Sequence, residues 1–293
     1  MSLPDYNSPS ALKAFLDSKG MAMQKKFGQN FLINSNARNK LVDALDVKKD
    51  TTVWEIGPGL GAMTHLILEK GAKLTVFEID KGFASVIKDF FGAYDTFSIV
   101  EGDVLKTWKK HFELTGVPDR LFGNLPYNIA ATILADFITE GVRFDSVVIT
   151  VQKEVASRIC AKPGTEDYSS FSVLCQWAYN VEPLLDLAGG SFWPRPNVDS
   201  RAVRLTKKNN WPCCKDRNCF MKLLRALYVA RRKTIKNNLT QFLSNASLAD
   251  EILMKAGIDS MTRAEKLCLE ELLHLSDIVL EYVNEETKNE YLR

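Results

Sequence analysis

The sequence predicts an α/β protein in which a doubly wound parallel sheet is followed by a small all-helical domain. From residue 51 onward, short apolar runs alternate with helical stretches, and this alternation is the βαβ pattern of a parallel sheet. A glycine-rich turn at residues 57–61 separates the first run from the first helical stretch. Past Lys207-Lys208-Asn209-Asn210 only helical periodicity remains, so we place a domain boundary near residue 208.

The expected elements of the first domain, residues 25–208, follow from the period of their apolar residues. Runs rich in β-branched and aromatic residues predict strands, while apolar residues three and four apart predict helices. The strands are expected at residues 52–56, 73–78, 97–100, 120–122, 146–151, 171–179 and 202–205. The helices between them are expected at residues 62–70, 81–91, 129–139 and 153–160.

Two segments flank this domain. Residues 1–24 are polar apart from a short amphipathic piece at residues 11–16, and we expect an irregular, loosely attached arm. Residues 209–293 are expected to form a helical domain, with helices at residues 219–228, 235–243, 248–256 and 269–283.

The composition favours a cytoplasmic protein that does not contact membranes, and we expect a monomer. With 293 residues, of which 46% are hydrophobic, the chain can bury its cores without disulfides. No apolar run approaches the ~20 residues of a membrane span, and no signal-peptide stretch opens the sequence. The six cysteines lack the spacing and the matching histidines of a zinc site, so we expect reduced thiols and no metal.

The net charge is only +2, but the charges are distributed unevenly. Residues 217–249 hold seven basic side chains and no acidic one, whereas residues 270–290 are rich in Glu and Asp. A basic surface of this kind suits a polyanion, although a solvated helix face is the alternative interpretation.

The turn Glu55-Ile56-Gly57-Pro58-Gly59-Leu60-Gly61-Ala62 predicts a site for a cofactor that contains adenosine. Its glycines allow a tight turn and close approach of a ligand to the backbone. Glu78 lies 21 positions after Gly57, at the end of the next strand, where a carboxylate binds ribose hydroxyls. NAD and S-adenosylmethionine both carry an adenosine ribose, so this spacing leaves the two open.

Two further residues follow the next strands of the predicted sheet. Asp103 could accept a hydrogen bond from an adenine amine, although an Asp after a strand is also a common helix cap. Asn124 ends the fourth strand, so these residues should meet at the carboxyl edge of one sheet. Neither a nucleophile–base pair nor a proton donor accompanies them, which favours methyl transfer from a sulfonium over hydride transfer.

Asn124-Leu125-Pro126-Tyr127 has the composition of a pocket that presents an amino nitrogen for methylation. The Asn124 side-chain oxygen and the Leu125 carbonyl can accept the two N–H bonds of an adenine amine, and the Tyr127 ring can stack on the base. Pro126 restricts Leu125 to an extended conformation, which keeps the two acceptors together. An ordinary turn after a strand is the alternative interpretation.

With Gln29-Asn30-Phe31-Leu32 added to these motifs, the chain resembles the rRNA adenine N6,N6-dimethyltransferases, which have a Rossmann-like class I methyltransferase sheet. Residues 192–200 resemble the F-x-P-x-P-x-V-x-S segment of this family. Residues 231–239 and 263–267 resemble the C-terminal domain of its small-subunit (16S) branch. The match runs from about residue 25 to residue 276.

The resemblance implies a role for individual residues. Asn30 and Leu32 would line the cofactor pocket, Gly57 and Gly59 would approach the cofactor, and Glu78 would hold its ribose. Asp103 would contact its adenine ring. Asn124 would contact both the cofactor and, with Leu125, the target amine. Tyr127 and Phe192 would sandwich a base extruded from its helix, since a stacked N6 cannot reach a methyl donor.

The resemblance further implies a metal-free enzyme that transfers methyl groups from S-adenosyl-L-methionine to two adjacent adenines. These adenines lie near the 3′ end of 16S rRNA in the small ribosomal subunit, and the resemblance also implies a role in subunit biogenesis. The alternatives are a large-subunit rRNA adenine methyltransferase of the macrolide-resistance type, a non-catalytic RNA-binding assembly factor, and an NAD-dependent oxidoreductase. One departure stands out, because Ser169-Ser170 replaces the Gly-Arg that is common in the small-subunit branch.

Overall fold

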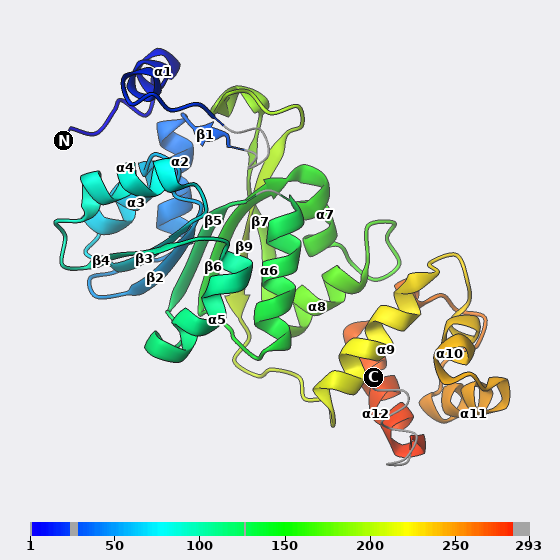
Figure 1. Ribbon diagram of the computed structural model, residues 1–293. Coiled ribbons are helices and arrows are strands. Elements are labelled where there is room, and N and C mark those ends of the chain that lie inside the picture. The colour runs from blue at the N-terminus through cyan, green and yellow to red at the C-terminus, as the bar shows by residue number, and fades with distance from the viewer. Residues whose placement is uncertain (1, 24–28, 126, 284–293) are drawn as a thin grey trace. The chain divides into compact units, whose positions relative to one another are not determined.

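A seven-stranded sheet is the framework of the structure, a computed structural model that describes residues 2–23, 29–125 and 127–283 (Figure 1). The strand order is β4-β3-β2-β5-β6-β9-β7. The pairs from β4 to β6 are parallel, and β9 is antiparallel to β6. The strands are β2 (Thr52–Ile56), β3 (Lys73–Glu78), β4 (Phe97–Glu101), β5 (Arg120–Asn124), β6 (Ser146–Gln152), β7 (Tyr179–Leu187) and β9 (Ser200–Lys207).

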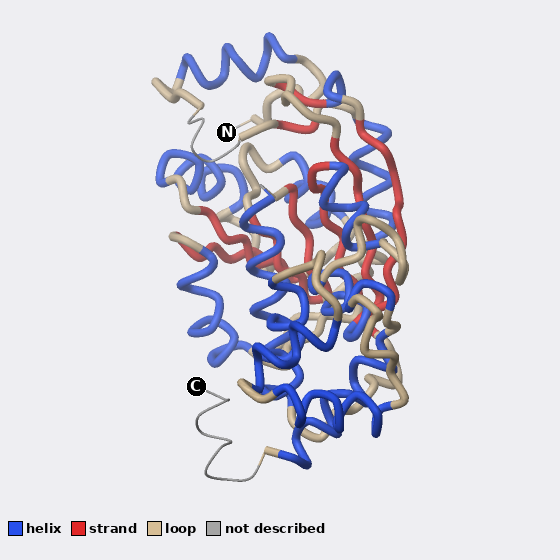
Figure 2. Tube along the Cα trace, turned by 90° about the vertical axis from the view of Figure 1, so that its right-hand side faces the viewer, coloured by secondary structure: helices blue, strands red, loops and turns tan. Residues whose placement is uncertain are grey.

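The strand order confirms the predicted doubly wound sheet. From β2 the chain proceeds outward to β3 and β4, and it then returns to the other side of β2 to form β5. The point between β2 and β5, where the direction of winding reverses, is where open sheets of this kind bind ligands. Figure 2 shows these strands in red, running alongside one another.

Helices cover both faces of the sheet. Side chains of neighbouring strand residues point to opposite faces, and on both faces they are apolar. Val53 packs with the buried apolar residues of α2 (Ser35–Ala44), α3 (Ala62–Glu69) and α4 (Lys81–Phe91). The adjacent Trp54 instead packs against aromatic side chains of the opposite face, among them Phe137 of α6 (Tyr127–Thr139), which meets Trp108 of α5 (Val104–Thr115). The sequence patterns predicted α3, α4 and α6, but they missed α2 and α5.

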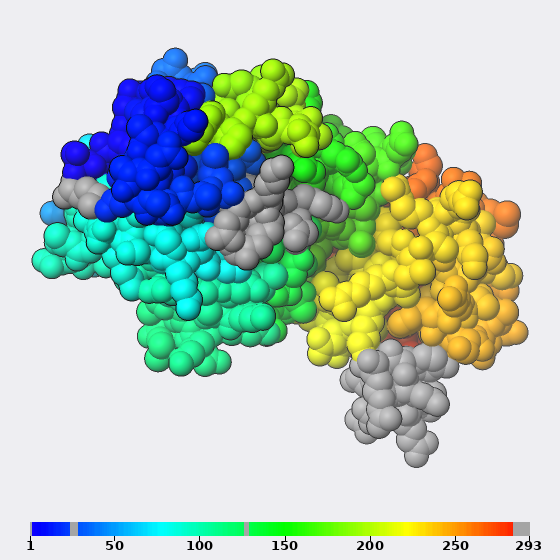
Figure 3. All heavy atoms as spheres, turned by 45° about the horizontal axis from the view of Figure 1, so that its top comes forward, coloured from blue at the N-terminus to red at the C-terminus, as the bar shows by residue number. Residues whose placement is uncertain are grey.

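The N-terminal segment is ordered and packed, which corrects the expectation of an irregular, loosely attached arm. Helix α1 (Pro9–Ser18) begins after Ser8, whose side chain accepts a hydrogen bond from the Ala11 amide. Leu12 and Leu16 are buried against Leu60, Phe83 and Val86. Figure 3 shows this segment in dark blue beside the cyan atoms of α4. The spacing of the apolar residues at 11–16 thus marked the side of a helix that packs against the rest of the domain.

A two-stranded ribbon joins β1 (Phe31–Leu32) to β8 (Phe192–Trp193) in antiparallel register. Leu32 pairs with Phe192, and Phe31 pairs with Trp193. Two segments that are distant in sequence and that both carry predicted site residues are therefore neighbours in the structure.

The strand expected at residues 171–179 was wrong, because this segment forms helix α8 (Ser170–Ala178). A capping box starts the helix, since the Ser169 side chain accepts a bond from the Ser172 amide and the Ser172 hydroxyl accepts one from the Ser169 amide. Most of the helix is buried, so its sequence is apolar on nearly every side. The run therefore lacks a helical period, and short apolar runs of this kind do not distinguish a strand from a helix.

The chain divides into two compact units. The first comprises Met1–Phe137, Val142–Ala156 and Asn180–Lys207, and the second comprises Ile138–Gly141, Ser157–Tyr179 and Lys208–Arg293. The boundary expected near residue 208 lies at one of the crossings between them. However, the second unit also includes α8 and the ends of α6 and of α7 (Lys153–Cys160), which the expected domain of residues 209–293 leaves out.

Between Lys208 and Val283, the part of the second unit that the structure describes contains four α-helices, as the sequence predicts. They are α9 (Arg217–Val229), α10 (Ile235–Leu243), α11 (Ala246–Ala256) and α12 (Leu269–Tyr282). Each begins after a residue that can cap a helix, and the side chains of Asp216, Thr234 and Asn245 accept bonds from backbone amides of the first turn. Their apolar faces bury leucines and Phe220, so this unit has a core of its own.

Candidate functional site

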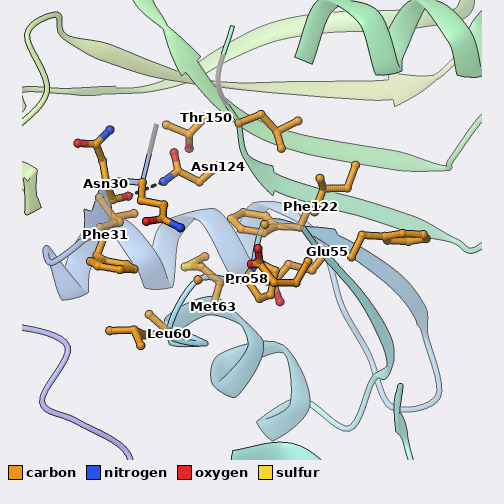
Figure 4. Close-up of a pocket in the computed structure, with 18 of the residues that line it drawn as sticks. Asn30, Phe31, Glu55, Pro58, Leu60, Met63, Phe122, Asn124 and Thr150 are labelled. Atoms are coloured by element: carbon orange, nitrogen blue, oxygen red, sulfur yellow. Dashed lines mark hydrogen bonds between the residues drawn. The ribbon is translucent and has the colours of Figure 1, made fainter. Parts of the chain in front are cut away.

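A pocket lies at the carboxyl edge of the sheet, at the reversal point between β2 and β5 (Figure 4). Its walls come from the turn after β2, the end of β3, the loop after β4 and the ends of β5 and β6. Of the predicted site residues, the structure brings Asn30, Leu32, Gly57, Gly59, Glu78, Asp103, Asn124 and Leu125 together around this pocket.

The turn between β2 and α3 approaches the pocket with bare backbone. Gly57 and Gly59 have φ values of +72° and +57°, a left-handed conformation that favours glycine. The Gly57 amide donates to the Phe77 carbonyl of β3 over 2.9 Å. At Gly59 a Cβ atom would lie 3.1 Å from the Phe31 ring, so the ring packs directly on the turn. A larger residue at position 59 would thus disturb both the turn and the segment around Phe31.

Glu78 ends β3 and is buried at the pocket wall. Its Oε1 atom accepts a hydrogen bond from the Asp80 amide over 2.8 Å, and the Gly59 amide also donates to this carboxylate. Burial raises its pKa to about 7, and the charge of Asp80 acts in the same direction. The carboxylate therefore braces the glycine turn and faces the pocket at the position where a ribose is expected.

Glu55 is a second buried carboxyl at the pocket, and the sequence patterns placed it only within the glycine-rich turn motif. The residue is 1% exposed, and its Oε2 atom accepts a bond from the Thr64 hydroxyl over 2.7 Å. Burial raises its pKa to about 8, because desolvation outweighs this hydrogen bond. The signal in the sequence was an acidic residue between Trp54 and Ile56, in the apolar part of the strand at residues 52–56.

Asp103 lies at the pocket and is also a helix cap. Its Oδ1 atom accepts a bond from the Leu105 amide over 3.0 Å at the start of α5. Both interpretations of this residue thus fit its position, because a carboxylate that caps a helix with one oxygen has a second oxygen to offer a ligand.

Asn124 connects the end of β5 to the segment before β1. Its Nδ2 atom donates to the Asn30 carbonyl over 3.0 Å, as the dashed line in Figure 4 shows. This bond fixes the orientation of the amide group, so that Oδ1 is the end of the side chain that can accept an N–H bond. Leu125 is held next to it, since its amide donates to the Thr150 carbonyl over 3.0 Å.

The other residues that were predicted to hold the target base are not among the described residues at the pocket. Pro126 and the Tyr127 side chain lie outside the described residues. Phe192 is 4% exposed and packs in the core with Leu32, and it is not among the described residues that line the pocket. The adjacent Trp193 is more exposed and stacks on Phe31, with ring centroids 6.2 Å apart. The role of Phe192 at the target base stays a prediction.

Tyr6, Leu12 and Thr150 are among the pocket residues that sequence reasoning missed. Tyr6 and Leu12 reach the pocket from the N-terminal segment. Thr150 stands opposite Asn124 on β6, and its buried hydroxyl has no hydrogen-bond partner among the residues that the structure describes. A buried polar group without a partner is costly, and here it faces a space that a polar ligand could fill. No local sequence pattern would have singled out any of them.

The second unit has a hollow lined by Arg231, Arg232, Arg263 and the loop at residues 164–166. Arg231 is strongly engaged, since its Nη2 atom donates to the carbonyls of Glu166 and Tyr168 and contacts the Glu265 carboxylate at 3.3 Å. Arg231, Arg232 and Lys233 are all exposed. The basic segment, residues 231–233, thus contains one arginine that is hydrogen-bonded to a loop and two neighbours that present positive charge to solvent.

Comparisons with known proteins match almost the whole chain. The family model described as ribosomal RNA adenine dimethylase matches residues 20–281. The ribosomal RNA small subunit methyltransferase A of Treponema denticola is 46% identical over 284 residues, which cover 95% of this chain and 97% of that protein. The protein of the same name from Treponema pallidum is 43% identical over 282 residues, covering 94% and 98%.

Two solved structures share the fold. A dimethyladenosine transferase from Plasmodium falciparum has a TM-score of 0.69 at 24% identity, covering 88% of this chain and 97% of that one. The 23S rRNA methyltransferase ErmE has a TM-score of 0.60 at 21% identity, covering 84% and 98%. Within the described ranges, no helix combines the length and apolar character needed to cross a membrane.

Proposed function

The chain belongs to the ribosomal RNA adenine dimethylase family, and we propose that it dimethylates N6 of two adjacent adenines near the 3′ end of 16S rRNA. The methyl donor is S-adenosyl-L-methionine, and the substrate is the small ribosomal subunit, so that the enzyme takes part in subunit biogenesis. The observation that carries this proposal is Asn124, an amide acceptor held by Asn30 beside a pocket with the carboxylates of Glu78 and Asp103.

The pocket residues fit the methyl donor by their chemistry. Gly57 and Gly59 leave room for close approach of a ligand to the backbone, Glu78 offers acceptors for ribose hydroxyls, and Asp103 offers one for the adenine amine. Asn30 and Leu32 also line the pocket. When bound, the sulfonium supplies an already activated methyl group, so the protein has to position the two reactants and exclude water. We propose that no metal takes part.

Asn124 and Leu125 would activate the target amine. The N6 lone pair of adenine is delocalised into the ring, and it becomes nucleophilic when both N–H bonds are drawn to acceptors that favour a pyramidal nitrogen. The Asn124 Oδ1 atom and the Leu125 carbonyl are proposed as these acceptors, with Tyr127 and Phe192 on the faces of the extruded base. After transfer, N6 releases a proton to solvent, and a second transfer to the monomethylated amine gives the dimethyl product.

The helical domain, residues 209–293, is proposed to dock on RNA through its basic segment. The names of the relatives favour small-subunit RNA over the large-subunit alternative, and the likeness to ErmE shows the fold alone. Asn124 and a complete set of cofactor carboxylates also argue against a non-catalytic assembly factor and a hydride-transfer enzyme. We propose that the enzyme acts as a monomer in the cytoplasm.

A methylation assay on assembled subunits tests the function. The protein is incubated with labelled S-adenosylmethionine and small ribosomal subunits that lack the modification, and the labelled bases are then mapped. Label is expected in two adjacent adenines near the 3′ end of the 16S rRNA. Label confined to large-subunit RNA, or no label although the protein binds the methyl donor, would overturn the proposal.

The Asn124→Ala variant tests the acceptor in the same assay. Because the substitution removes an acceptor that acts only on the reacting amine, methyl transfer should fall by at least about 100-fold while RNA binding persists. Turnover at the wild-type rate would show that Asn124 is not the acceptor. The overall function would then be judged by which bases carry the label.

A further inference from the structure

The N-terminal segment closes one side of the pocket, and the proposed function gives it no role. Tyr6 and Leu12 line the same pocket as the glycine turn and Glu78. Leu12 is fully buried and packs with Leu60 of the turn and with Phe83 and Val86 of α4. The segment therefore lies against the elements that would hold the cofactor.

Tyr6 bonds directly to the glycine turn. Its hydroxyl donates to the Leu60 carbonyl over 2.8 Å, across 54 positions of sequence. Burial raises the pKa of this hydroxyl above its usual range, with the nearby Glu55 acting in the same direction, so the group keeps the proton that it donates. The bond restrains the turn in addition to the bond from the Gly59 amide to Glu78.

Arg38 links the N-terminal segment to Leu32, which also lines the pocket. The side chain is 6% exposed, and its Nη1 atom donates to the Leu32 carbonyl over 2.7 Å and to the Tyr6 carbonyl over 3.4 Å. Its Nη2 atom donates to the Asn7 side chain over 2.7 Å. A continuous set of bonds thus runs from Leu32 through Arg38 and Tyr6 to Leu60, and the residues at both of its ends line the pocket.

We infer that residues 6–16 form a wall of the S-adenosylmethionine pocket and that Tyr6, held by Arg38, is a positioning residue for the cofactor turn. The inference rests on the proposed function, because it assigns the ligand of the same pocket. A turn that is held in its binding conformation loses less freedom when the ligand binds, so the bonds of Tyr6 raise affinity for the cofactor. Tyr6 does not touch the reacting groups, so its loss should change cofactor affinity and leave the rate at saturation nearly unchanged.

The test compares cofactor binding and turnover in full-length variants. Tyr6→Phe keeps the ring and removes one hydrogen bond, and it should weaken S-adenosylmethionine binding by roughly three- to tenfold. Its kcat at saturating cofactor should stay within about twofold of the wild type. Leu12→Ala, which opens the wall, should weaken binding further. Lys13→Ala, an exposed position on the same helix, is the matched control and should bind as the wild type does.

Hydrogen exchange gives a second measurement that does not depend on any variant. If the segment is part of the pocket, saturating cofactor should slow amide exchange in α1. Wild-type affinity in Tyr6→Phe together with unchanged exchange in α1 would overturn the inference while the proposed function stands. A wild-type protein that does not bind S-adenosylmethionine at all would instead overturn the proposed function, and the inference with it.

Discussion

At the scale of the residue, the pocket is defined by carboxyl groups that are held away from water. Glu55 and Glu78 both have pKa values raised by burial, to about 8 and about 7. A sulfonium cofactor carries a positive charge, and a nearby cation favours the ionised form of a carboxyl group. Without a ligand, ionisation of these carboxyl groups destabilises the protein. With the proposed cationic ligand bound, their ionised form would be stabilised.

Glu55 gives a prediction for stability as a function of pH. Between its ordinary value of 4.5 and its raised value of about 8, the folded protein holds a proton that the unfolded chain releases. The free energy of unfolding contributed by this residue therefore falls as pH rises through this window. Glu55→Gln cannot ionise and keeps an acceptor for Thr64, so at pH 8.5 it should exceed the wild type by as much as about 4 kcal/mol.

Denaturant unfolding at pH 5 and pH 8.5, without cofactor, measures this difference. The two proteins should have similar stability at pH 5, where Glu55 is protonated. Glu113→Gln, at an exposed position, is the control and should show the same pH dependence as the wild type. If the wild type and Glu55→Gln respond to pH identically, Glu55 is already ionised at pH 5 in the folded protein, and burial does not keep it protonated.

At the scale of the element, the residues of the basic segment have two roles: Arg231 stabilises the fold, and Arg232 and Lys233 are available to bind RNA. Arg231 precedes α10 and bonds to the loop at residues 166–168 and to Glu265, so we expect it to stabilise this part of the second unit. The Arg231 side chain is partly exposed, and its removal should cost about 1 kcal/mol or less. Arg232 and Lys233 are exposed, and their loss should leave stability within about 0.5 kcal/mol.

RNA affinity should depend more on Arg232 and Lys233 than on Arg231. The double variant Arg232→Ala/Lys233→Ala should weaken binding to small-subunit RNA and should reduce the slope of log K against log salt by about 1 for each phosphate that is no longer neutralised. Filter binding at several salt concentrations, with Arg231→Ala alongside, separates the two roles. An Arg231→Ala protein of wild-type stability that loses as much RNA affinity as the double variant would contradict the division.

The elements themselves show where sequence patterns suffice. The bounds of β2, β3, α4 and α10 match the expected ranges, because strong apolar periods and capping residues mark them. Helix α8 was misassigned because it is buried on nearly every side, and its apolar run has no polar face to reveal the period. Helix α2 was missed because its polar surface outweighs the few residues that it buries.

At the scale of the whole molecule, the candidate site divides into parts that follow from sequence and parts that need the folded chain. Glu78, Asp103 and Asn124 could be placed at one edge because parallel strands present their carboxyl ends together. The bond from Asn124 to Asn30 and the path from Arg38 to Tyr6 depend on contacts between distant segments, which no local pattern encodes. Phe192 could be predicted as a motif residue, but nothing in the motif indicates that its ring is buried with Leu32.

The location of the pocket within one unit gives the last prediction. All the described residues that line it belong to the first unit, so cofactor binding should stabilise that unit directly. A ligand at 100 times its Kd contributes about 2.7 kcal/mol. Hydrogen exchange with and without S-adenosylmethionine should therefore show slower exchange in β2, β3 and α3, while α9–α12 exchange at their own rate. Equal slowing in the helices of the second unit would show that the two units open together, and no slowing in the first would place the cofactor elsewhere.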